Sequence, residues 1–150
     1  MKFILTIVIV FQSFALFAQS KLSEEKRNEF EAQKIAFFTQ LLELSPEEAT
    51  VFWPLYNEMH KKIREQEEEK RKEIRRFREN KETTEKQSKE LITKFLDYEQ
   101  QVLNIKKEYY NKLTEKVPPY KVCKIEWVER RFHQQLLNKM RQQSPAAPKK

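Results

Sequence analysis

Along most of the chain, apolar residues recur every three or four positions, and short polar or proline-containing segments separate these stretches. Such spacing places apolar side chains on one face of a helix. We therefore expect four helices, over about residues 23–44, 46–80, 84–117 and 120–141. The predicted fold class is all-α.

The boundary between the first two predicted helices carries a clear local signal. Ser45 is a typical N-cap, Pro46 occupies the first helical position and Glu48 stands at the third. This arrangement is a capping box, in which the proline costs nothing because the first helical N–H has no partner. Together with Leu44, these residues predict a structural corner.

The second predicted helix contains two irregularities. Pro54 removes a backbone hydrogen bond, so we expect it to bend or interrupt the helix. Beyond Ile63, residues 64–73 include no apolar side chain. We expect this segment to stay helical through charge pairs and to project into solvent.

The third predicted helix has the most regular pattern in the chain. A weaker capping box, Thr84 with Gln87, begins it, and Pro118 with Pro119 ends it after Val117. Its apolar residues are spaced alternately four and three apart, as in a heptad seam: Leu91, Phe95, Tyr98, Val102, Ile105 and Tyr109.

The lengths of these helices constrain the architecture. At about 1.5 Å per residue, the second and third are each roughly 50 Å long, and a partly apolar seam between two such rods cannot close a globular core. We expect an elongated helical hairpin with two shorter flanking helices, completed by a second copy of the chain. The helical domain should span residues 19–142, before a disordered tail at 143–150.

The first 18 residues resemble no part of this pattern. Lys2 precedes an apolar run that begins at Phe3, and a small residue follows at Ala18. These features are typical of a secretory signal peptide, cleaved after Ala18 or alternatively after Ser20. An uncleaved anchor is the other interpretation, but its unbroken apolar span is shorter than the ~20 residues that a bilayer needs. We expect export and no membrane span after cleavage.

Composition narrows the possible functions. The 150 residues include no glycine, which argues against Gly-rich phosphate loops, dinucleotide fingerprints and two-residue hairpins. Without the usual glycine C-cap, helices should end at Pro, Asn or polar loops. The single cysteine, Cys123, has no partner for an internal disulfide. We expect it to be buried as a small hydrophobe, with an intermolecular bridge as the alternative.

The net charge of +7 falls to +6 if cleavage removes Lys2. For a cytosolic chain this charge would indicate nucleic acid, but for an exported chain we expect acidic membrane surfaces, anionic polysaccharides or protein instead. No nucleic-acid partner is predicted.

Candidate reactive chemistry is sparse. The two histidines are His60 and His133, and the carboxylates lie mostly on charge-compensated faces, so no catalytic constellation is evident and neither an enzyme nor a cofactor is expected. Glu129 and His133, four residues apart, are a feasible half-site for a divalent ion. An ion pair or hydrogen bond is the simpler interpretation of that pair.

Aromatic and apolar residues gather around the predicted corner. Phe38, Phe52 and Tyr56 fit a simple core, whereas some of the others should be exposed, which marks a protein-contact surface or a homodimer seam. Nearby cations would attract acidic unfolded chains. The predicted protein-binding residues are Phe37, Phe38, Leu41, Phe52, Trp53 and Tyr56.

Two parts of the sequence carry a family resemblance. Leu41–Ala49 followed by Phe52–Glu58 resembles the helix-corner motif of exported Spy/CpxP-like proteins, and is most similar to the branch called sensors of ECF-type sigma factors. The corner of that family is Leu-Thr-x-x-Gln, where Ser45 and Glu48 stand here. The segment from Tyr109 through the double proline to Phe132 is also similar to that branch.

This resemblance implies a small periplasmic all-helical protein, often a cradle-shaped dimer, that acts in the envelope stress response. Spy-like members are ATP-independent chaperones, CpxP-like members restrain a signalling receptor, and CnrX-like members bind metal through a His-rich set. Two histidines depart from the metal-sensing pattern. We expect a stress sensor or regulator with a concave apolar and basic working surface, and a holdase chaperone is the alternative.

Overall fold

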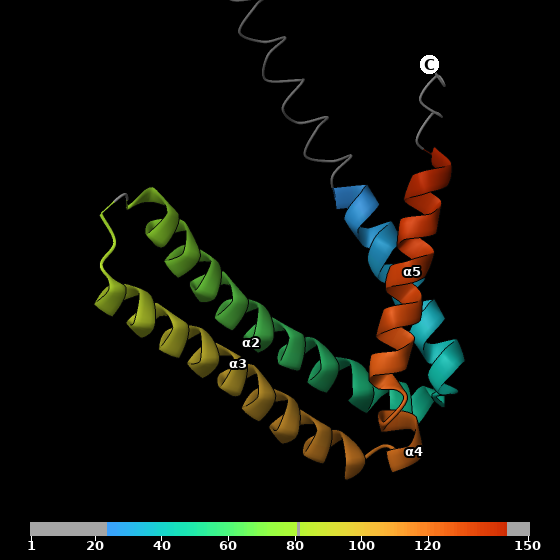
Figure 1. Ribbon diagram of the computed structural model, residues 1–150. Coiled ribbons are helices and arrows are strands. Elements are labelled where there is room, and N and C mark those ends of the chain that lie inside the picture. The colour runs from blue at the N-terminus through green and yellow to red at the C-terminus, as the bar shows by residue number, and fades with distance from the viewer. Residues whose placement is uncertain (1–23, 81, 144–150) are drawn as a thin grey trace, which may run out of the picture. The chain divides into compact units, whose positions relative to one another are not determined.

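The computed structural model describes residues 24–80 and 82–143, and every regular element within them is a helix. After a first helix at residues 24–42, the chain forms α2 (Pro46–Glu79), α3 (Glu85–Thr114), α4 (Pro119–Val122) and α5 (Ile125–Gln143) (Figure 1). The all-α prediction is therefore confirmed. The predicted signal peptide at 1–18 and Ser23, where the first helix was expected to begin, lie outside the described residues.

The described residues fall into two compact units. The first unit combines the first helix, through Glu43, with the chain from Val128 onward, and the second is the continuous segment Leu44–Trp127. The single domain predicted for residues 19–142 stays a prediction. Among the helices described, none has the length and apolar character needed to cross a bilayer.

The predicted corner residues begin α2 as expected. The Glu48 backbone N–H donates to the Ser45 hydroxyl at 3.2 Å, and the Ser45 N–H donates to the Glu48 carboxylate at 2.8 Å. Pro46 occupies the first turn, and Leu44 is buried. The same Glu48 oxygen also accepts from the Lys121 ammonium at 2.7 Å, so the start of α2 is tied to α4.

The first helix ends at a non-glycine residue in a left-handed conformation. Glu43 has φ 55°, and its N–H donates to the Gln40 carbonyl at 3.2 Å. A side chain with a Cβ costs about 1–2 kcal/mol in this region, which glycine usually occupies. The expectation of a polar or Asn ending is confirmed for α2, whose C-cap is Asn80, but it did not include a left-handed glutamate.

Pro54 does not interrupt α2, which continues without a break from Pro46 to Glu79. The proline deprives one carbonyl, that of Thr50, of its helical donor. Both Pro54 and Thr50 are exposed, so water can bond this carbonyl and the helix can continue. Of the two outcomes expected at Pro54, a bend or an interruption, the interruption does not occur.

Within the second unit, α2 and α3 lie side by side and run in opposite directions (Figure 1). Their buried side chains concentrate where the N-terminal half of α2 meets the C-terminal end of α3. The remaining part of the predicted heptad seam, from Leu91 to Ile105, is only half-buried. The buried residues of the pair are Phe52, Tyr56, Met59, Ile63, Tyr109 and Leu113.

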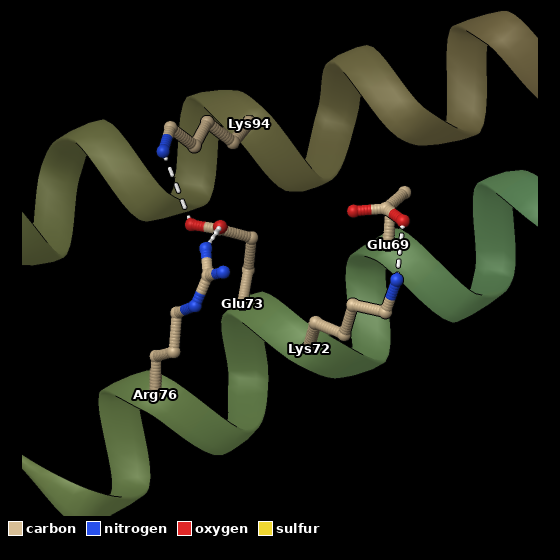
Figure 2. Close-up of polar contacts among 5 residues, drawn as sticks. All are labelled: Glu69, Lys72, Glu73, Arg76 and Lys94. Carbon is tan, nitrogen blue, oxygen red and sulfur yellow. Dashed lines mark hydrogen bonds and ion pairs between the residues drawn. The ribbon is translucent and has the colours of Figure 1, made fainter.

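Ion pairs join the two helices farther from this core. The Lys94 ammonium donates to Glu73 across the pair at 3.1 Å, and Arg76 donates to the same carboxylate at 2.7 Å (Figure 2). The hydrogen bond from Lys94 and the two nearby cations hold the pKa of Glu73 below its ordinary value. The seam is thus apolar at one end and electrostatic toward the other.

The charged segment at 64–73 was expected to project into solvent. It lies along α3 instead. It remains helical with pairs such as Lys72–Glu69 at 2.6 Å (Figure 2). It also reaches the neighbouring helix, because Lys70 pairs with Glu99 of α3. Long charged side chains replace the missing apolar contacts, since their stems cover surface while their charged ends pair.

The C-terminal helices differ from the prediction at two points. α3 ends at Thr114 instead of Val117, because a residue before proline is disfavoured in the helical conformation. The single helix expected over 120–141 is divided into the one-turn α4 and the longer α5. Between them the Lys124 N–H donates to the Lys121 carbonyl at 3.1 Å, a tighter turn than an α-helix makes.

In the first unit, the first helix packs against α5. The Lys139 ammonium donates to the Gln33 side-chain carbonyl at 2.9 Å, and the Phe132 ring meets aromatic rings of the first helix. α5 continues through Gln143, where the disordered tail was expected to begin. The rest of that predicted tail, residues 144–150, lies outside the described residues.

Candidate protein-contact site

The residues predicted to contact a partner fall into two separate groups. Three belong to the first helix, in the first unit, and three belong to the first turns of α2, in the second unit. The predicted residues therefore belong to two separate aromatic groups, one in each unit. In chain order, the residues are Phe37, Phe38, Leu41, Phe52, Trp53 and Tyr56.

The group on α2 is mainly core. The Phe52 and Tyr56 rings are stacked with centroids 5.3 Å apart, and both side chains are buried. Trp53 is half-buried and meets both rings edge-on, while the His60 ring lies 4.3 Å from that of Tyr56. Only Trp53 of the three predicted residues reaches the surface.

The group in the first unit is organised by one residue of α5, Phe132. Its ring centroid lies 5.5 Å from Phe30, 5.4 Å from Phe37 and 5.9 Å from Phe38. Phe38 is buried, Phe37 is half-buried and Phe30 is exposed. Such tilted and edge-on contacts are favourable for aromatic pairs, so Phe132 fixes the rings that line the surface beside it.

A groove of about 480 Å³ lies next to this cluster. Phe37 and Leu41 of the first helix line one part of it, and a single face of α5 lines the rest. The α5 residues recur at three- and four-residue spacing, which keeps them on that face. They are Arg131, Gln134, Gln135, Asn138, Lys139 and Gln142.

A second groove, of about 710 Å³, follows another side of the same helix pair. Phe30 and Met140 contribute apolar surface to it, and Met140 is well exposed. Lys139 and Gln142 line both grooves. These two polar residues therefore lie between two apolar surfaces, one at Phe37 and Leu41 and the other at Phe30 and Met140.

The lining of the first groove favours a particular kind of ligand. Its apolar contributions come from Phe37 and Leu41, and its polar contributions are two cations and four amide side chains, with no carboxylate. Amide groups can pair with a peptide backbone, and the Arg131 guanidinium and Lys139 ammonium favour carboxylates. The groove is suited to an extended or helical polypeptide with apolar and acidic side chains.

The candidate metal pair lies on α5. Glu129 is half-buried and His133 is exposed. Within residues 24–80 and 82–143, no group of three His, Cys, Asp or Glu side chains is placed to hold a metal ion. A pair alone supplies two of the four ligands that zinc usually takes in proteins.

The expectation that Cys123 is buried was wrong. The thiol is exposed at the end of α4, where its Sγ donates to the Tyr120 carbonyl at 3.1 Å. The physical reason is the division of the last helix, since the turn after Val122 faces Cys123 outward while Val122 and Ile125 are buried.

Comparison of the chain with known protein families, with curated proteins and with solved structures found no match.

Sequence reasoning missed the α5 side of the groove. None of its residues was among those predicted to contact a partner, because Arg131 and Lys139 carried no signal beyond their charge. The recurrence of amides on one face of α5, at Gln134, Gln135 and Asn138, could have indicated a polar face with a binding role. The pairing of that face with Phe37 depends on tertiary structure.

Proposed function

We propose that this chain is an exported helical protein that binds another polypeptide through an apolar and basic surface, and that it acts as an envelope-stress sensor or regulator linked to ECF-type sigma factor signalling. The observation that carries the binding role is the groove beside Phe37 and Leu41, whose lining combines apolar surface, amides and cations without an acid.

The organisation of the chain supports this proposal. Large apolar side chains stay exposed on several helices, and where such side chains form a contiguous patch they typically meet another protein. Examples are Phe30 on the first helix, Ile92 and Leu96 on α3, and Met140 on α5. The proposal includes the arrangement of α2 and α3 as an elongated hairpin flanked by the shorter helices, and a periplasmic location after cleavage near Ala18.

A holdase chaperone is the second candidate, because the same groove would accept many unfolded acidic chains instead of one regulator. A divalent-metal sensor is a weaker candidate, since Glu129 and His133 would need further ligands. The regulator and the chaperone would use the same surface and differ in the number of partners that they bind.

The decisive experiment reverses the charges of the groove. The double variant R131E/K139E should weaken binding of an acidic polypeptide about tenfold or more, because like charges would face its carboxylates. R130E/R141E is the matched control, since both arginines are exposed on α5 and neither lines either of the two grooves described above. Circular dichroism checks that both variants stay folded.

Two readouts separate the candidates. Suppression of the aggregation of reduced α-lactalbumin at a near-stoichiometric ratio would support the chaperone function. No suppression, together with cross-linking in cells to a single envelope protein, would support the regulator function. In either assay, equal binding by folded R131E/K139E and the native protein would show that this groove is not the binding surface.

A further inference from the structure

Two large aromatic side chains are exposed where α4 leads into α5, at the end of the second unit. Tyr120 is 56% exposed and Trp127 is 41% exposed. Between them in the sequence, Lys121, Val122 and Ile125 are buried. This segment therefore packs through one set of residues and leaves both rings at the surface.

The cations around these rings are lysines. The ammonium groups of Lys121 and Lys124 lie 5.9 Å and 5.7 Å from the centroid of the Tyr120 ring, and Lys116 is exposed in the turn after α3. Lys124 stands three residues before Trp127, about one helical turn away. The methylene stems of such lysines can lie along apolar surface while their charged ends stay in water.

Ion pairs offset part of this positive charge. The Lys106 ammonium donates to the Glu126 carboxylate at 3.1 Å, and Lys121 donates to Glu48 at 2.7 Å. Residues 106–127 still include six lysines and three glutamates, a net charge of +3. This part of the chain would therefore attract an anionic surface.

The combination of these side chains fits a lipid headgroup layer better than a protein surface. Lysine is depleted at the centre of protein–protein contacts, where arginine is enriched. Exposed Trp and Tyr rings beside lysines are instead typical of proteins that lie at the boundary between headgroups and acyl chains. There each ring buries its apolar body and keeps its polar atom in contact with water.

We propose that Lys116, Tyr120, Lys124 and Trp127 form a lysine–aromatic patch that docks on the surface of an anionic phospholipid bilayer. The two rings enter the layer between the headgroups, and the ammonium groups pair with lipid phosphates. The attachment is reversible, because stable anchoring requires a larger apolar insertion. Net charge alone would attract acidic surfaces of any kind, whereas the exposed rings make this site specific for a lipid layer.

This proposal goes beyond the peptide-binding function and does not depend on it, since the patch belongs to the second unit and the groove to the first. The two can fail separately. A protein that binds polypeptides but no vesicles would overturn only the docking site. A protein that binds vesicles but no polypeptide would overturn only the proposed function.

The fluorescence of Trp127 tests the insertion. The chain has two tryptophans, so W53F leaves Trp127 as the single reporter, and circular dichroism checks that this variant is folded. With vesicles of phosphatidylcholine and phosphatidylglycerol, the emission should shift to shorter wavelength and be quenched by lipids brominated on their acyl chains. Inorganic phosphate should cause neither change. An unchanged spectrum with the vesicles, or the same shift with phosphate alone, would overturn the proposal.

Vesicle sedimentation measures the contribution of the rings. Y120S/W127S should lower the affinity for these vesicles about tenfold or more, because two rings would no longer leave water. I92S/L96S is the matched control, since these α3 side chains are 59% and 65% exposed and lie outside the patch. The control should bind as the native protein does. Equal losses in the two variants would show that any exposed apolar side chain suffices, and would overturn the site.

Charge reversal separates the patch from attraction by net charge. K116E/K124E and K86E/K89E change the net charge equally, and Lys86 and Lys89 are exposed near the start of α3. Only K116E/K124E should weaken vesicle binding about tenfold or more, since a lysine contributes to binding when it lies close to the anionic surface. Equal weakening by the two double variants would mean that the vesicles respond to net charge alone, and would overturn the proposal.

Discussion

Individual side chains at the start of α2 connect helix capping to the response of the fold to acid. One carboxylate oxygen of Glu48 accepts from both the Ser45 N–H and the Lys121 ammonium. Its hydrogen bond with Lys121 contributes most to lowering the pKa of Glu48 below the ordinary 4.5, followed by the bond from Ser45. The folded chain therefore holds this proton less tightly than the unfolded chain does.

The sign of the pH effect follows from this depressed pKa. The stabilisation is complete above the pKa of the unfolded chain and is lost as the pH falls through the lower pKa of the folded chain. E48Q should therefore be less stable than the native protein near neutral pH, and the gap between their urea midpoints should narrow as the pH falls below about 4.5. E65Q, at an exposed position of α2, serves as control. A gap that does not change with pH would contradict the expectation.

Glu43 stores backbone strain at the end of the first helix, since its φ of 55° suits glycine better than a residue with a Cβ. E43G should stabilise the protein by about 0.5–1 kcal/mol, the relief of strain being partly offset by the greater freedom of glycine in the unfolded chain. E43A removes the same carboxylate but keeps the Cβ, and should give no such gain. Thermal unfolding of the two variants distinguishes these outcomes. Equal stability of the two variants would show that the backbone at Glu43 is not strained.

At the scale of the elements, the α2–α3 pair has a stability gradient along its length. Its buried side chains lie at the end that includes Tyr109 and Leu113, whereas ion pairs and half-buried residues hold the other end. Exposed ion pairs contribute little to stability compared with buried apolar side chains. We therefore expect the end near Asn80 to open first.

A matched pair of truncations measures this gradient. L113A removes a fully buried side chain and should cost about 2–5 kcal/mol, whereas L91A, at a half-buried position of the same helix, should cost about 1 kcal/mol or less. Denaturant unfolding gives both values. Equal costs would mean that the seam is packed uniformly.

Local signals made the helices predictable to a large extent. The capping boxes at Ser45 and Thr84 depend on residues three apart, and both are formed as the sequence indicated. The division of the last helix was missed because no breaking residue stands at Cys123 or Lys124. That break depends on how the turn after the double proline packs.

At the scale of the whole molecule, the contacts that hold the corner and those that define the candidate site are both long-range, and the sequence pattern did not indicate them. The Glu48–Lys121 pair joins residues 73 positions apart, and Phe132 meets rings that lie near the other end of the chain. Aromatic composition identified Phe37 and Leu41 as candidates, but the residues opposite them in the groove depend on tertiary pairing. Local periodicity likewise could not predict that the first unit combines two segments that are far apart in the sequence.

That division has a consequence for how the protein is made. The first helix leaves the ribosome about one hundred residues before Phe132 does, because the second unit is encoded between the two parts of the first. At usual rates of translation, Phe30, Phe37 and Phe38 remain without this ring for about 5–20 s. The nascent chain must therefore keep this aromatic segment from aggregating at least until Phe132 has been synthesised, and a premature stop upstream of Phe132 would leave the segment permanently uncovered.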